Sequence, residues 1–340
     1  MKIKKILTLI LALMLVVSLV VGCSSTPKDV GKKEEPKKEE KPAYPERAIE
    51  FVVPFSAGGG SDILARTITK IITDKGWVSQ PINVVNKPGG SGSIGYAYVA
   101  EKKGNPYYIA TVSSSFYTAP LLGNSPVSYK DFQPVAGLAM DTLALFVRED
   151  SEFTSIKQVI EKAKAEPKGI AIGGTSGTSD DAVMYRVLQD KAGIELKYVP
   201  FESGGQVMTA LLGGHVDLVW ANPGEALNQV EAGKARAIVV ASSERIPGFE
   251  NVPTLIEEGI NAKLAQFRGV VMPKDAPPEA VKYMEDVLKK LSESKEWQEM
   301  YIEKNSITPR FLGHEEFAKA IVELSDMYAE IFEKIGATKK

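Results

Sequence analysis

The sequence predicts an α/β protein of two units, with mostly parallel sheets flanked by helices. Apolar strand-like runs alternate with amphipathic helical patterns, and this alternation restarts in the second half of the chain. Glycine-rich loops also follow several expected strands, which is where ligands bind in such sheets. The stretch from about residue 44 to residue 340 is long enough for one or two domains with a hydrophobic core.

The first unit begins with an apolar run at 49–54, which we expect to be a strand. After it, Leu64, Ile68, Ile71 and Ile72 have the spacing of one face of a helix. The next expected elements are a strand at 82–86, a helix near 96–101 and a strand at 107–114.

The second unit repeats this alternation without an obvious sequence repeat. Its first expected strand is 169–174, and Val183, Val187 and Leu188 mark the helix that follows. The later expected elements are a strand at 196–201, a helix through Leu211, a strand at 216–220, a helix around Leu227 and a strand at 235–242. Two C-terminal helices are expected at 278–291 and 315–335.

Four loops stand at the ends of expected strands, and three of them contain glycine pairs. These loops are 55–62, 113–117, 173–181 and 201–205. A glycine-rich turn that leads into a helix leaves backbone N–H groups free, and the helix dipole favours negative charge there. The pattern therefore indicates that both units offer loops for an anionic group, although an isolated glycine run also occurs in tight turns without a ligand.

Motifs for nucleotide binding and catalysis are weak or absent. The first loop lacks the lysine of a Walker A motif, and Gly90–Gly95 matches G-x-G-x-x-G without an acid at the end of the next strand. His215 and His314 lack metal-ligand spacing, and no G-x-S-x-G motif is present. Asp180 and Asp181 are adjacent on an expected helix, so we interpret them as helix-capping residues. We expect a binding protein that is not an enzyme and uses no cofactor or metal.

The N-terminal segment indicates export. A basic start precedes an apolar run at 6–21, which is typical of a secretory signal and shorter than the roughly 20 residues that span a bilayer. The run ends near Cys23, the only cysteine, in a pattern that resembles the lipobox of bacterial lipoproteins. We predict a signal peptide at 1–23, a disordered Lys/Glu/Pro tether at 24–43, and a lipid on Cys23 that anchors the protein to the outer face of the cell membrane.

The charge balance argues against nucleic acid as a partner. The chain has 41 Lys and Arg against 43 Asp and Glu, and removal of the three lysines of the signal leaves 38 against 43. A net charge of about −5 provides no basic surface for a polyanion. We expect a monomer whose partners are a small ligand and a membrane.

Six stretches resemble the solute receptors of tripartite tricarboxylate transporters, also called Bug receptors. The two most specific are YPERAIEFVVPFSAGGGSDILAR at 44–66 and the long stretch at 198–260 that begins YVPFESGGQ. The others lie at 82–100, 129–139, 170–180 and 268–281. The resemblance covers nearly all of 44–340.

The resemblance implies a two-lobed periplasmic-binding-protein fold, similar to type II, with a hinge between the lobes. Lobe 1 would comprise 44–140 plus 266–340, and lobe 2 would comprise 141–265. The hinge is expected near 138–147 and 264–271. Such a receptor closes over a small organic acid, here a di- or tricarboxylate or a related carboxylate, and delivers it to the membrane subunits of the transporter.

The family holds a ligand carboxylate or carbonyl through main-chain amides and bound water in the loops of both lobes. Carried over to this sequence, the first-lobe residues are Phe55, Ser56, Gly58, Gly59, Gly60, Ser61, Asp62, Ser113, Ser114, Ser115 and Phe116. The second-lobe residues are Gly173, Gly174, Thr175, Ser176, Gly177, Thr178, Ser179, Phe201, Glu202, Ser203, Ala221 and Asn222.

One departure from the family's pattern concerns the ligand. Family members often carry a neutral residue where Asp180 and Asp181 stand, and an inward-pointing acid would favour a ligand with an amine. A receptor for another transporter class, or a sensor with an amino-acid-like ligand, remains an alternative. An exported enzyme would need a nucleophile or a metal set.

Overall fold

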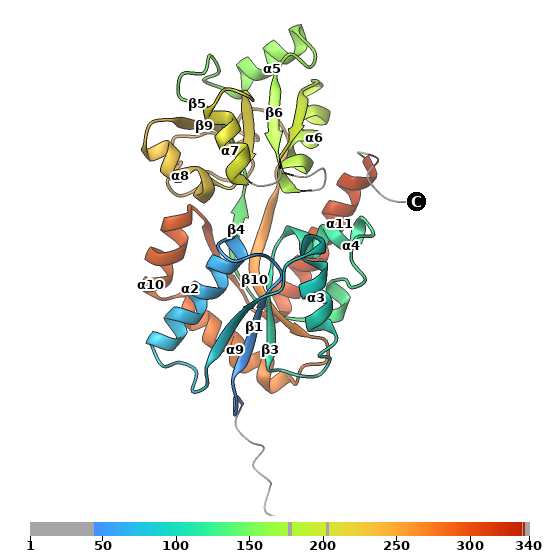
Figure 1. The fold of residues 1–340 in the computed structure, drawn as a ribbon, viewed down its shortest axis with the longest axis vertical. Coiled ribbons are helices and arrows are strands. Elements are labelled where there is room, and N and C mark those ends of the chain that lie inside the picture. Colours follow the sequence, from blue (N-terminus) through green and yellow to red (C-terminus); the bar gives the residue numbers. More distant parts are fainter. Residues whose placement is uncertain (1–43, 176–178, 202–203, 335, 337–340) are drawn as a thin grey trace, which may run out of the picture. The chain divides into compact units, whose positions relative to one another are not determined.

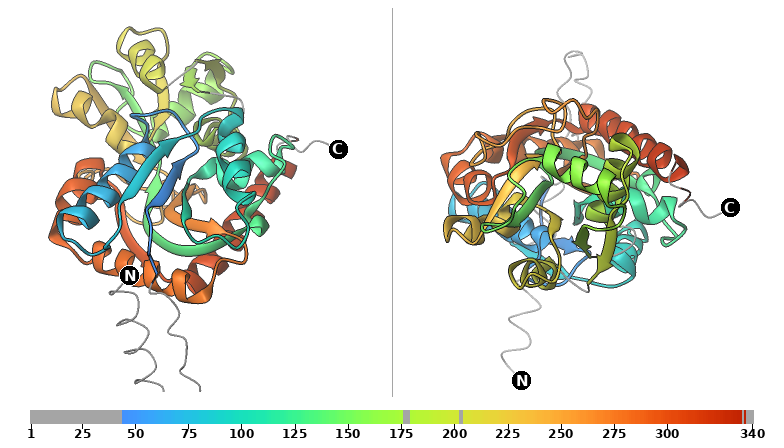
Figure 2. Two further views of the ribbon diagram at one scale, coloured as in Figure 1. Left: turned by 60° about the horizontal axis from the view of Figure 1, so that its bottom comes forward. Right: turned by 90° about the horizontal axis from the view of Figure 1, so that it is seen from above.

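The computed structural model describes residues 44–175, 179–201, 204–334 and 336, which fold around two separate β-sheets (Figure 1). Six strands form one sheet in the order β11-β4-β10-β3-β1-β2, and five form the other in the order β7-β6-β8-β5-β9. Helices flank both sheets in each view (Figure 2), so the predicted two-lobed α/β fold class is confirmed. Within the described ranges, no helix combines the length and the apolarity needed to cross a membrane.

Three parallel strands begin the first sheet. β1 (Ile49–Val53) lies between β2 (Ile82–Asn86) and β3 (Tyr108–Val112). β1 is almost entirely buried, as an apolar strand is when helices cover both faces of its sheet.

Antiparallel strands complete the first sheet. β10 (Ala265–Pro273) pairs with β3 on one side and with β4 (Phe132–Thr142) on the other, and β11 (Thr308–Leu312) pairs with β4 at the edge. β4 and β10 are the longest strands in the described residues, and they run side by side towards the second sheet (Figure 1).

The second sheet has the same two kinds of pairing. β6 (Ala171–Gly174) runs parallel to β7 (Lys197–Pro200) and to β8 (Leu218–Ala221). β5 (Ala144–Arg148) is antiparallel to β8 and to β9 (Ala235–Val240).

Both sheets are therefore mixed, whereas the sequence predicted mostly parallel ones. Every antiparallel pair involves β4, β5, β10 or β11, which the alternation of strands and helices did not identify. Parallel neighbours need a crossover connection, usually a helix. β5 instead follows β4 after the single residue Leu143, so the chain passes directly from one sheet to the other.

Each expected helix is present to within a few residues at its ends, whereas α4, α5 and α10 were not predicted. Their bounds are α2 (Gly60–Asp74), α3 (Ser93–Ala100), α4 (Ser114–Leu121), α5 (Ile156–Ala165), α6 (Asp180–Ala192), α7 (Gly204–Leu212), α8 (Pro223–Glu231), α9 (Pro278–Ser292), α10 (Lys295–Trp297) and α11 (His314–Lys334). Short helical segments lie at η1 (Gly90–Gly92), η2 (Tyr129–Asp131) and the π-helical η3 (Gln298–Glu303).

The apolar face of α2 shows how the sequence pattern becomes packing. Leu64, Ile68, Ile71 and Ile72 are all buried, and they belong to one cluster with Phe51 of β1. Full burial of each such side chain contributes about 1.5–3 kcal/mol to stability. This face therefore holds α2 against β1.

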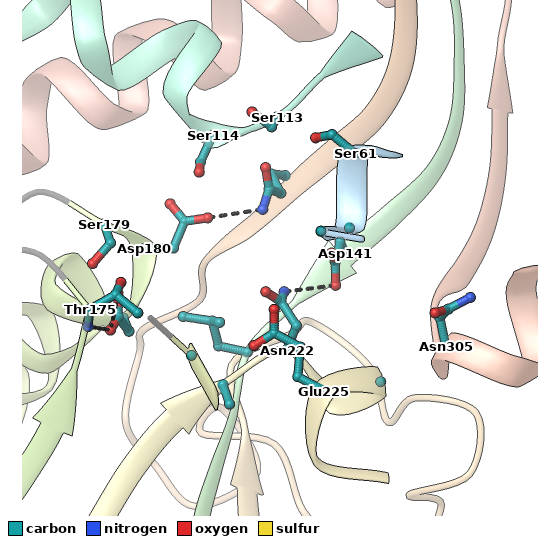
Figure 3. A pocket seen from close by; sticks show the side chains of 18 of the residues that line it. Ser61, Ser113, Ser114, Asp141, Thr175, Ser179, Asp180, Asn222, Glu225 and Asn305 are labelled. Carbon is teal, nitrogen blue, oxygen red and sulfur yellow. Dashed lines mark hydrogen bonds between the residues drawn. The ribbon is translucent and has the colours of Figure 1, made fainter. Parts of the chain in front are cut away.

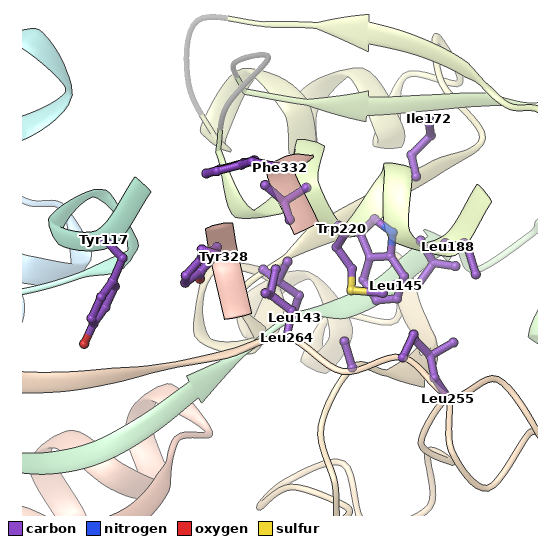
Figure 4. Close-up of a cluster of buried hydrophobic side chains, with 14 of the residues drawn as sticks. Tyr117, Leu143, Leu145, Ile172, Leu188, Trp220, Leu255, Leu264, Tyr328 and Phe332 are labelled. Carbon is purple, nitrogen blue, oxygen red and sulfur yellow. The ribbon is translucent and has the colours of Figure 1, made fainter. Parts of the chain in front are cut away.

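A second cluster joins helices of the first sheet to strands of the second (Figure 4). It contains Tyr117 of α4 and Tyr328 and Phe332 of α11, together with Leu145 of β5 and Trp220 of β8. Tyr117 and Tyr328 stack with ring centroids 5.9 Å apart. This core brings the C-terminal helix next to the start of α6, where the site described below begins.

The chain passes between the sheets at Leu143 and returns along 241–264. The predicted hinge segments 138–147 and 264–271 fall in β4, β5 and β10. The lobe boundaries after 140 and 265, and a movement between the lobes, remain predictions.

Candidate ligand-binding site

A cleft of about 720 Å³ lies where strands of both sheets end (Figure 3). The segments that follow β1, β3, β6 and β8 line it, and all of these strands point their carboxyl ends into the cleft. This position agrees with the one predicted from parallel-sheet topology. The volume is within the roughly 300–1,000 Å³ of small-molecule sites.

The first wall of the cleft comprises the starts of α2 and α4. At α2, Gly58 has φ of +85°, a left-handed conformation that side chains disfavour, and Gly59 is the N-cap residue without a side-chain cap. The N–H of Asp62 bonds to the Gly59 carbonyl at 2.9 Å. The N–H groups of Gly59, Gly60 and Ser61 have no acceptor in the part of the chain that the structure describes.

The three consecutive glycines have different surroundings. A Cβ on Gly60 would lie 3.3 Å from Nη2 of Arg268, so this glycine lets the guanidinium lie against the helix start. A Cβ on Gly59 would meet only the Ser56 carbonyl oxygen, at 3.7 Å. The backbone angle requires a glycine at 58, and contact with Arg268 favours one at 60. Packing gives no reason for the absence of a side chain at Gly59.

Asp62 lies in the first turn of α2 but does not line the cleft. Its carboxylate accepts hydrogen bonds from the Gly58 N–H at 2.9 Å, from Arg66 Nε at 2.8 Å and from Asn86 Nδ2 at 2.9 Å. Burial opposes ionisation, but these donors and the charge of Arg66 lower the pKa of Asp62 below its ordinary value. Its negative charge is therefore compensated outside the cleft.

The start of α4 adds donors to the first wall. Ser113 is the N-cap residue and its side chain does not cap the helix. The N–H groups of Ser114 and Ser115 have no acceptor among the described residues. Five unpartnered backbone amides thus line one wall, at the positive ends of two helix dipoles.

The second wall comprises the starts of α6, α7 and α8, and it carries acids. Asp180, the first residue of α6, lines the cleft and accepts hydrogen bonds from Gln266 Nε2 and from the Tyr328 hydroxyl, both at 3.0 Å. Burial raises the pKa of the Asp180 carboxyl to about 6, although hydrogen bonds from Tyr328 and Ser114 oppose the shift. The interpretation of Asp180 as a capping residue was wrong, because Ser179 is the N-cap and these contacts direct the Asp180 side chain towards β10 and α11.

Asp181 also lines the cleft, but it binds its own loop. It accepts hydrogen bonds from the Thr175 N–H and, at 3.1 Å, from the Thr175 hydroxyl. It therefore holds the end of β6 against the start of α6, a role close to the capping predicted for it.

Glu225, in the first turn of α8, projects into the cleft (Figure 3). Glu225 is exposed to the solvent of the cleft, and partial desolvation of its carboxyl, followed by the charge of Asp141, raises its pKa above the ordinary value. No hydrogen bond or ion pair of the Glu225 side chain is found with other described residues. A Cβ on Gly204 of α7 would lie 3.0 Å from its Oε2, so this glycine makes room for the carboxylate.

A buried ion pair forms the floor between the two walls. Arg268 of β10 donates from Nε to Asp141 of β4 at 2.9 Å, and Asn222 donates to the other oxygen of Asp141 at the same distance. Arg268 is the only cationic side chain among the residues that line the cleft, and Asp141 already compensates its charge.

The structure places about half of the predicted site residues on the cleft surface. Those that line it are Phe55, Gly58, Gly59, Gly60, Ser61, Ser113, Ser114, Ser115, Thr175, Ser179, Ala221 and Asn222. Those that lie away from it are Ser56, Asp62, Phe116, Gly173, Gly174 and Phe201. Ser176, Gly177, Thr178, Glu202 and Ser203 fall outside the described residues, as does Cys23. Ligand contact by any of these residues remains a prediction.

Packing accounts for several residues that lie away from the cleft. Phe116 belongs to a buried aromatic group with Tyr96 and Phe132. A Cβ on Gly174 would lie 2.3 Å from the Tyr198 hydroxyl and 2.6 Å from Oδ2 of Asp181, so no larger residue fits there.

Sequence reasoning missed several residues that line the cleft. The polar ones are Asp141, Glu225, Gln266, Arg268, Tyr301 and Asn305, and the apolar ones include Leu143, Val207, Met208, Trp220 and Ile307. One signal was available for Asp141 and Arg268, since each is a charged residue inside an otherwise apolar strand. No group of three or more His, Cys, Asp or Glu residues in the described part of the chain is arranged to hold a metal.

Comparison with known proteins identifies the family. The model of the family described as "Tripartite tricarboxylate transporter family receptor" (TctC) matches residues 64–337. The chain belongs to this receptor family. The resemblance seen in the sequence is therefore confirmed.

Relatives and solved structures match over most of the chain. A UPF0065 protein of Cupriavidus necator is 30% identical over 303 residues, which is 87% of this chain and 90% of the relative. The crystal structure of a TctC solute-binding protein from Polaromonas is 29% identical, with a TM-score of 0.74 over 86% of this chain and 99% of that one. The periplasmic binding protein BugD is 26% identical, also with a TM-score of 0.74, over 87% of this chain and 100% of its own.

Tripartite tricarboxylate receptors are solute-binding proteins that act outside the cytoplasm. The chain is accordingly a solute receptor and not an enzyme. The cleft between its two sheets is the candidate place for the solute.

Proposed function

We propose that this receptor captures a small organic acid in the cleft and passes it to the membrane subunits of a tripartite tricarboxylate-type transporter. The supporting observation is the set of five unpartnered amides on the first wall, at Gly59, Gly60, Ser61, Ser114 and Ser115. Backbone N–H groups at a helix start donate to anions, and the dipole adds attraction for negative charge. A ligand carboxylate would satisfy these donors without needing a basic side chain.

The lobes would close over the ligand. The chain crosses between the sheets at Leu143 and along 241–264, and the paired strands β4 and β10 lie at these crossings. Rotation about such a pair would bring the two walls together. Small-angle scattering with and without saturating ligand should show a smaller radius of gyration in the complex, and an unchanged radius would contradict closure.

The carboxylate requirement is tested by calorimetry on the full chain with a panel of linear and branched mono-, di- and tricarboxylates. At least one acid should bind, and its primary amide should bind about tenfold to a hundredfold more weakly, because the charge-assisted hydrogen bonds are lost. An amide that binds as tightly as its acid would refute the proposed carboxylate site.

The proposed location rests on the N-terminal sequence pattern. A lipid on Cys23 would hold the receptor at the outer face of the cell membrane, or on the periplasmic side where an outer membrane exists, and the receptor would act there as a monomer. Cys23→Ser should release the protein from the membrane fraction. If the variant remains in that fraction in the same proportion as the unmodified protein, the lipid anchor is refuted.

A further inference from the structure

We propose that the ligand carries an ammonium group in addition to its carboxylate, so that the receptor binds a small zwitterionic aminocarboxylate. The carboxylate would bind the first wall, and the ammonium group would bind Asp180 and Glu225 on the second. This inference rests on the proposed function and specifies the class of ligand.

The charges that line the cleft do not balance. Among the described residues that line it, there are four carboxylates, those of Asp141, Asp180, Asp181 and Glu225, and one cation, Arg268. A dicarboxylate would add more negative charge to this set. Acids that lie near one another in a cleft disfavour further negative charge, so an excess of them favours a positively charged partner.

Two of the four acids already have partners. Asp141 forms the ion pair with Arg268, and Asp181 accepts the N–H and hydroxyl of Thr175. Asp180 accepts hydrogen bonds from three neutral donors among the described residues, Gln266, Tyr328 and Ser114, and it has no ion-pair contact with a cation there. Together with Glu225, which has no such partner, it supplies two carboxylates without a bound cation.

An independent observation comes from Gln266, which also lines the cleft. Its Nε2 donates to Asp180, whereas its Oε1 has no hydrogen-bond partner among the described residues, although the residue is only 5% exposed. A buried carbonyl oxygen without a donor is uncommon and costly. The unpartnered oxygen belongs to the same amide that contacts Asp180. A ligand donor next to this amide would have the neutral Oε1 of Gln266 and the charged carboxylate of Asp180 as acceptors.

An ammonium group has the donors that these acceptors require. It carries three N–H bonds and no lone pair, which suits carboxylate acceptors such as Asp180 and Glu225. Ser61 and Ser114 lie on the opposite side of the cleft from Glu225 in Figure 3. Asp180 lies beside Ser114 in the same view, so the acceptors extend from the edge of the first wall at Asp180 to Glu225 on the far side of the cleft.

The test uses calorimetry on the full chain with matched pairs of compounds. Each proteinogenic amino acid and each linear ω-aminocarboxylate of about three to six carbons is compared with the same acid lacking the amine, and with the dicarboxylate of equal length. The best aminocarboxylate should bind at least about tenfold more tightly than both counterparts. The corresponding alkylamine without a carboxylate should bind equally weakly.

Two variants locate the ammonium site, and each has a matched control on the same helix. Glu225→Gln should reduce the preference for the amine about tenfold or more, whereas Glu231→Gln, at the exposed end of α8, should leave it unchanged. Asp180→Asn should act like Glu225→Gln, with Asp190→Asn at the exposed end of α6 as its control. Thermal unfolding without ligand will show whether each variant is folded.

The outcomes separate this inference from the proposed function. If a di- or tricarboxylate binds as tightly as the best aminocarboxylate, the ammonium site is refuted and the carboxylate receptor stands. If the amine preference survives in folded Glu225→Gln and Asp180→Asn proteins, its assignment to these residues is wrong. If no carboxylate binds, with or without an amine, the proposed function and this inference both fail.

Discussion

The starts of α2 and α6 use the same local structure with opposite electrostatic results. Each helix begins after a parallel strand, lacks a side-chain cap and carries an aspartate in its first turn. Asp62 is bound by Arg66 and Asn86 outside the cleft, and its pKa is lowered. Asp180 lines the cleft without a bound cation, and burial raises its pKa to about 6. A helix start thus becomes a donor site or an acceptor site according to where its first-turn acid finds partners.

The largest expected effect concerns the ion pair between the two walls. Arg268 gives its hydrogen bonds to Asp141, and it acts on Asp180 only through its charge, which opposes the effect of burial on the Asp180 pKa without cancelling it. Asp141→Ala should lower the free energy of unfolding by about 3 kcal/mol, the lower end of the range for breaking a buried pair, because cleft water reaches part of Arg268. Urea unfolding should show a lower midpoint with an unchanged slope.

The matched control for Asp141→Ala is an exposed pair. Asp74→Ala removes the partner of Lys70, whose side chain and that of Asp74 are both 59% exposed. Its effect should be at most about 0.5 kcal/mol. If Asp141→Ala costs no more than this control, Arg268 does not depend on Asp141 and the contrast between the walls breaks down.

The next effect is on ligand affinity and differs between the walls. Gly59→Val introduces a side chain beside the unpartnered amides, at an ordinary φ of −81° and with room around the Cβ. The loss of charge-assisted hydrogen bonds should weaken binding by about 1.5–3 kcal/mol, while the melting temperature without ligand should change little. Calorimetry and thermal unfolding measure the two quantities.

Gly205→Val provides the comparison on the second wall. Gly205 also lines the cleft and has open space around its Cβ, but it is remote in sequence from the first-wall amides. We expect a smaller loss of affinity than for Gly59→Val. Equal losses would mean that both glycines only provide space and that the amides of the first wall have no special role.

The smallest effect is a difference in pH dependence. Because burial raises the pKa of Asp180 to about 6 in the folded state, the folded protein binds more protons than the unfolded chain between the ordinary pKa of an aspartate and pH 6, and stability falls as pH rises through this range. Asp180→Asn should remove this decrease in the free energy of unfolding. We expect the decrease to be about 1–2 kcal/mol between about pH 4 and pH 7, because cleft water partly solvates the carboxyl.

Asp62→Asn should change the pH dependence in the opposite sense. The folded pKa of Asp62 is lowered, so its contribution to stability is present above the unfolded value and is lost as pH falls. The free energy of unfolding of Asp62→Asn should therefore fall less on acidification than that of the unmodified protein. Urea unfolding at a series of pH values gives the slope of the free energy of unfolding against pH. If both variants change this slope in the same direction, the contrast between α2 and α6 is refuted.

Periodicity and glycine placement were sufficient to predict much of the fold and one wall of the site. The helix face at Leu64 and Ile68, the buried strand at 49–53 and the loops at strand ends all follow from local pattern. The first wall was predictable because backbone donors at a helix start depend on few side chains.

The remaining features depend on contacts between distant parts of the chain. Asp141 and Arg268 are 127 residues apart, and only the pairing of β4 with β10 brings them together. Nor could the sequence distinguish Asp62 from Asp180, since both are first-turn acids. Their surroundings differ because Arg66 and Asn86 lie next to one, whereas Tyr328 and Gln266 lie next to the other.

The location of the cleft acids in the first turns of α6 and α8 has a consequence for the evolution of specificity. Both acids lie in the first turn of a helix at the surface of the cleft, and the fold is held by cores that lie elsewhere. Asp180 and Glu225 can each become the corresponding amide by one base change in their codons, with little disturbance of the backbone. Descendants of one gene could therefore diverge to accept solutes of different net charge before their scaffolds changed at all.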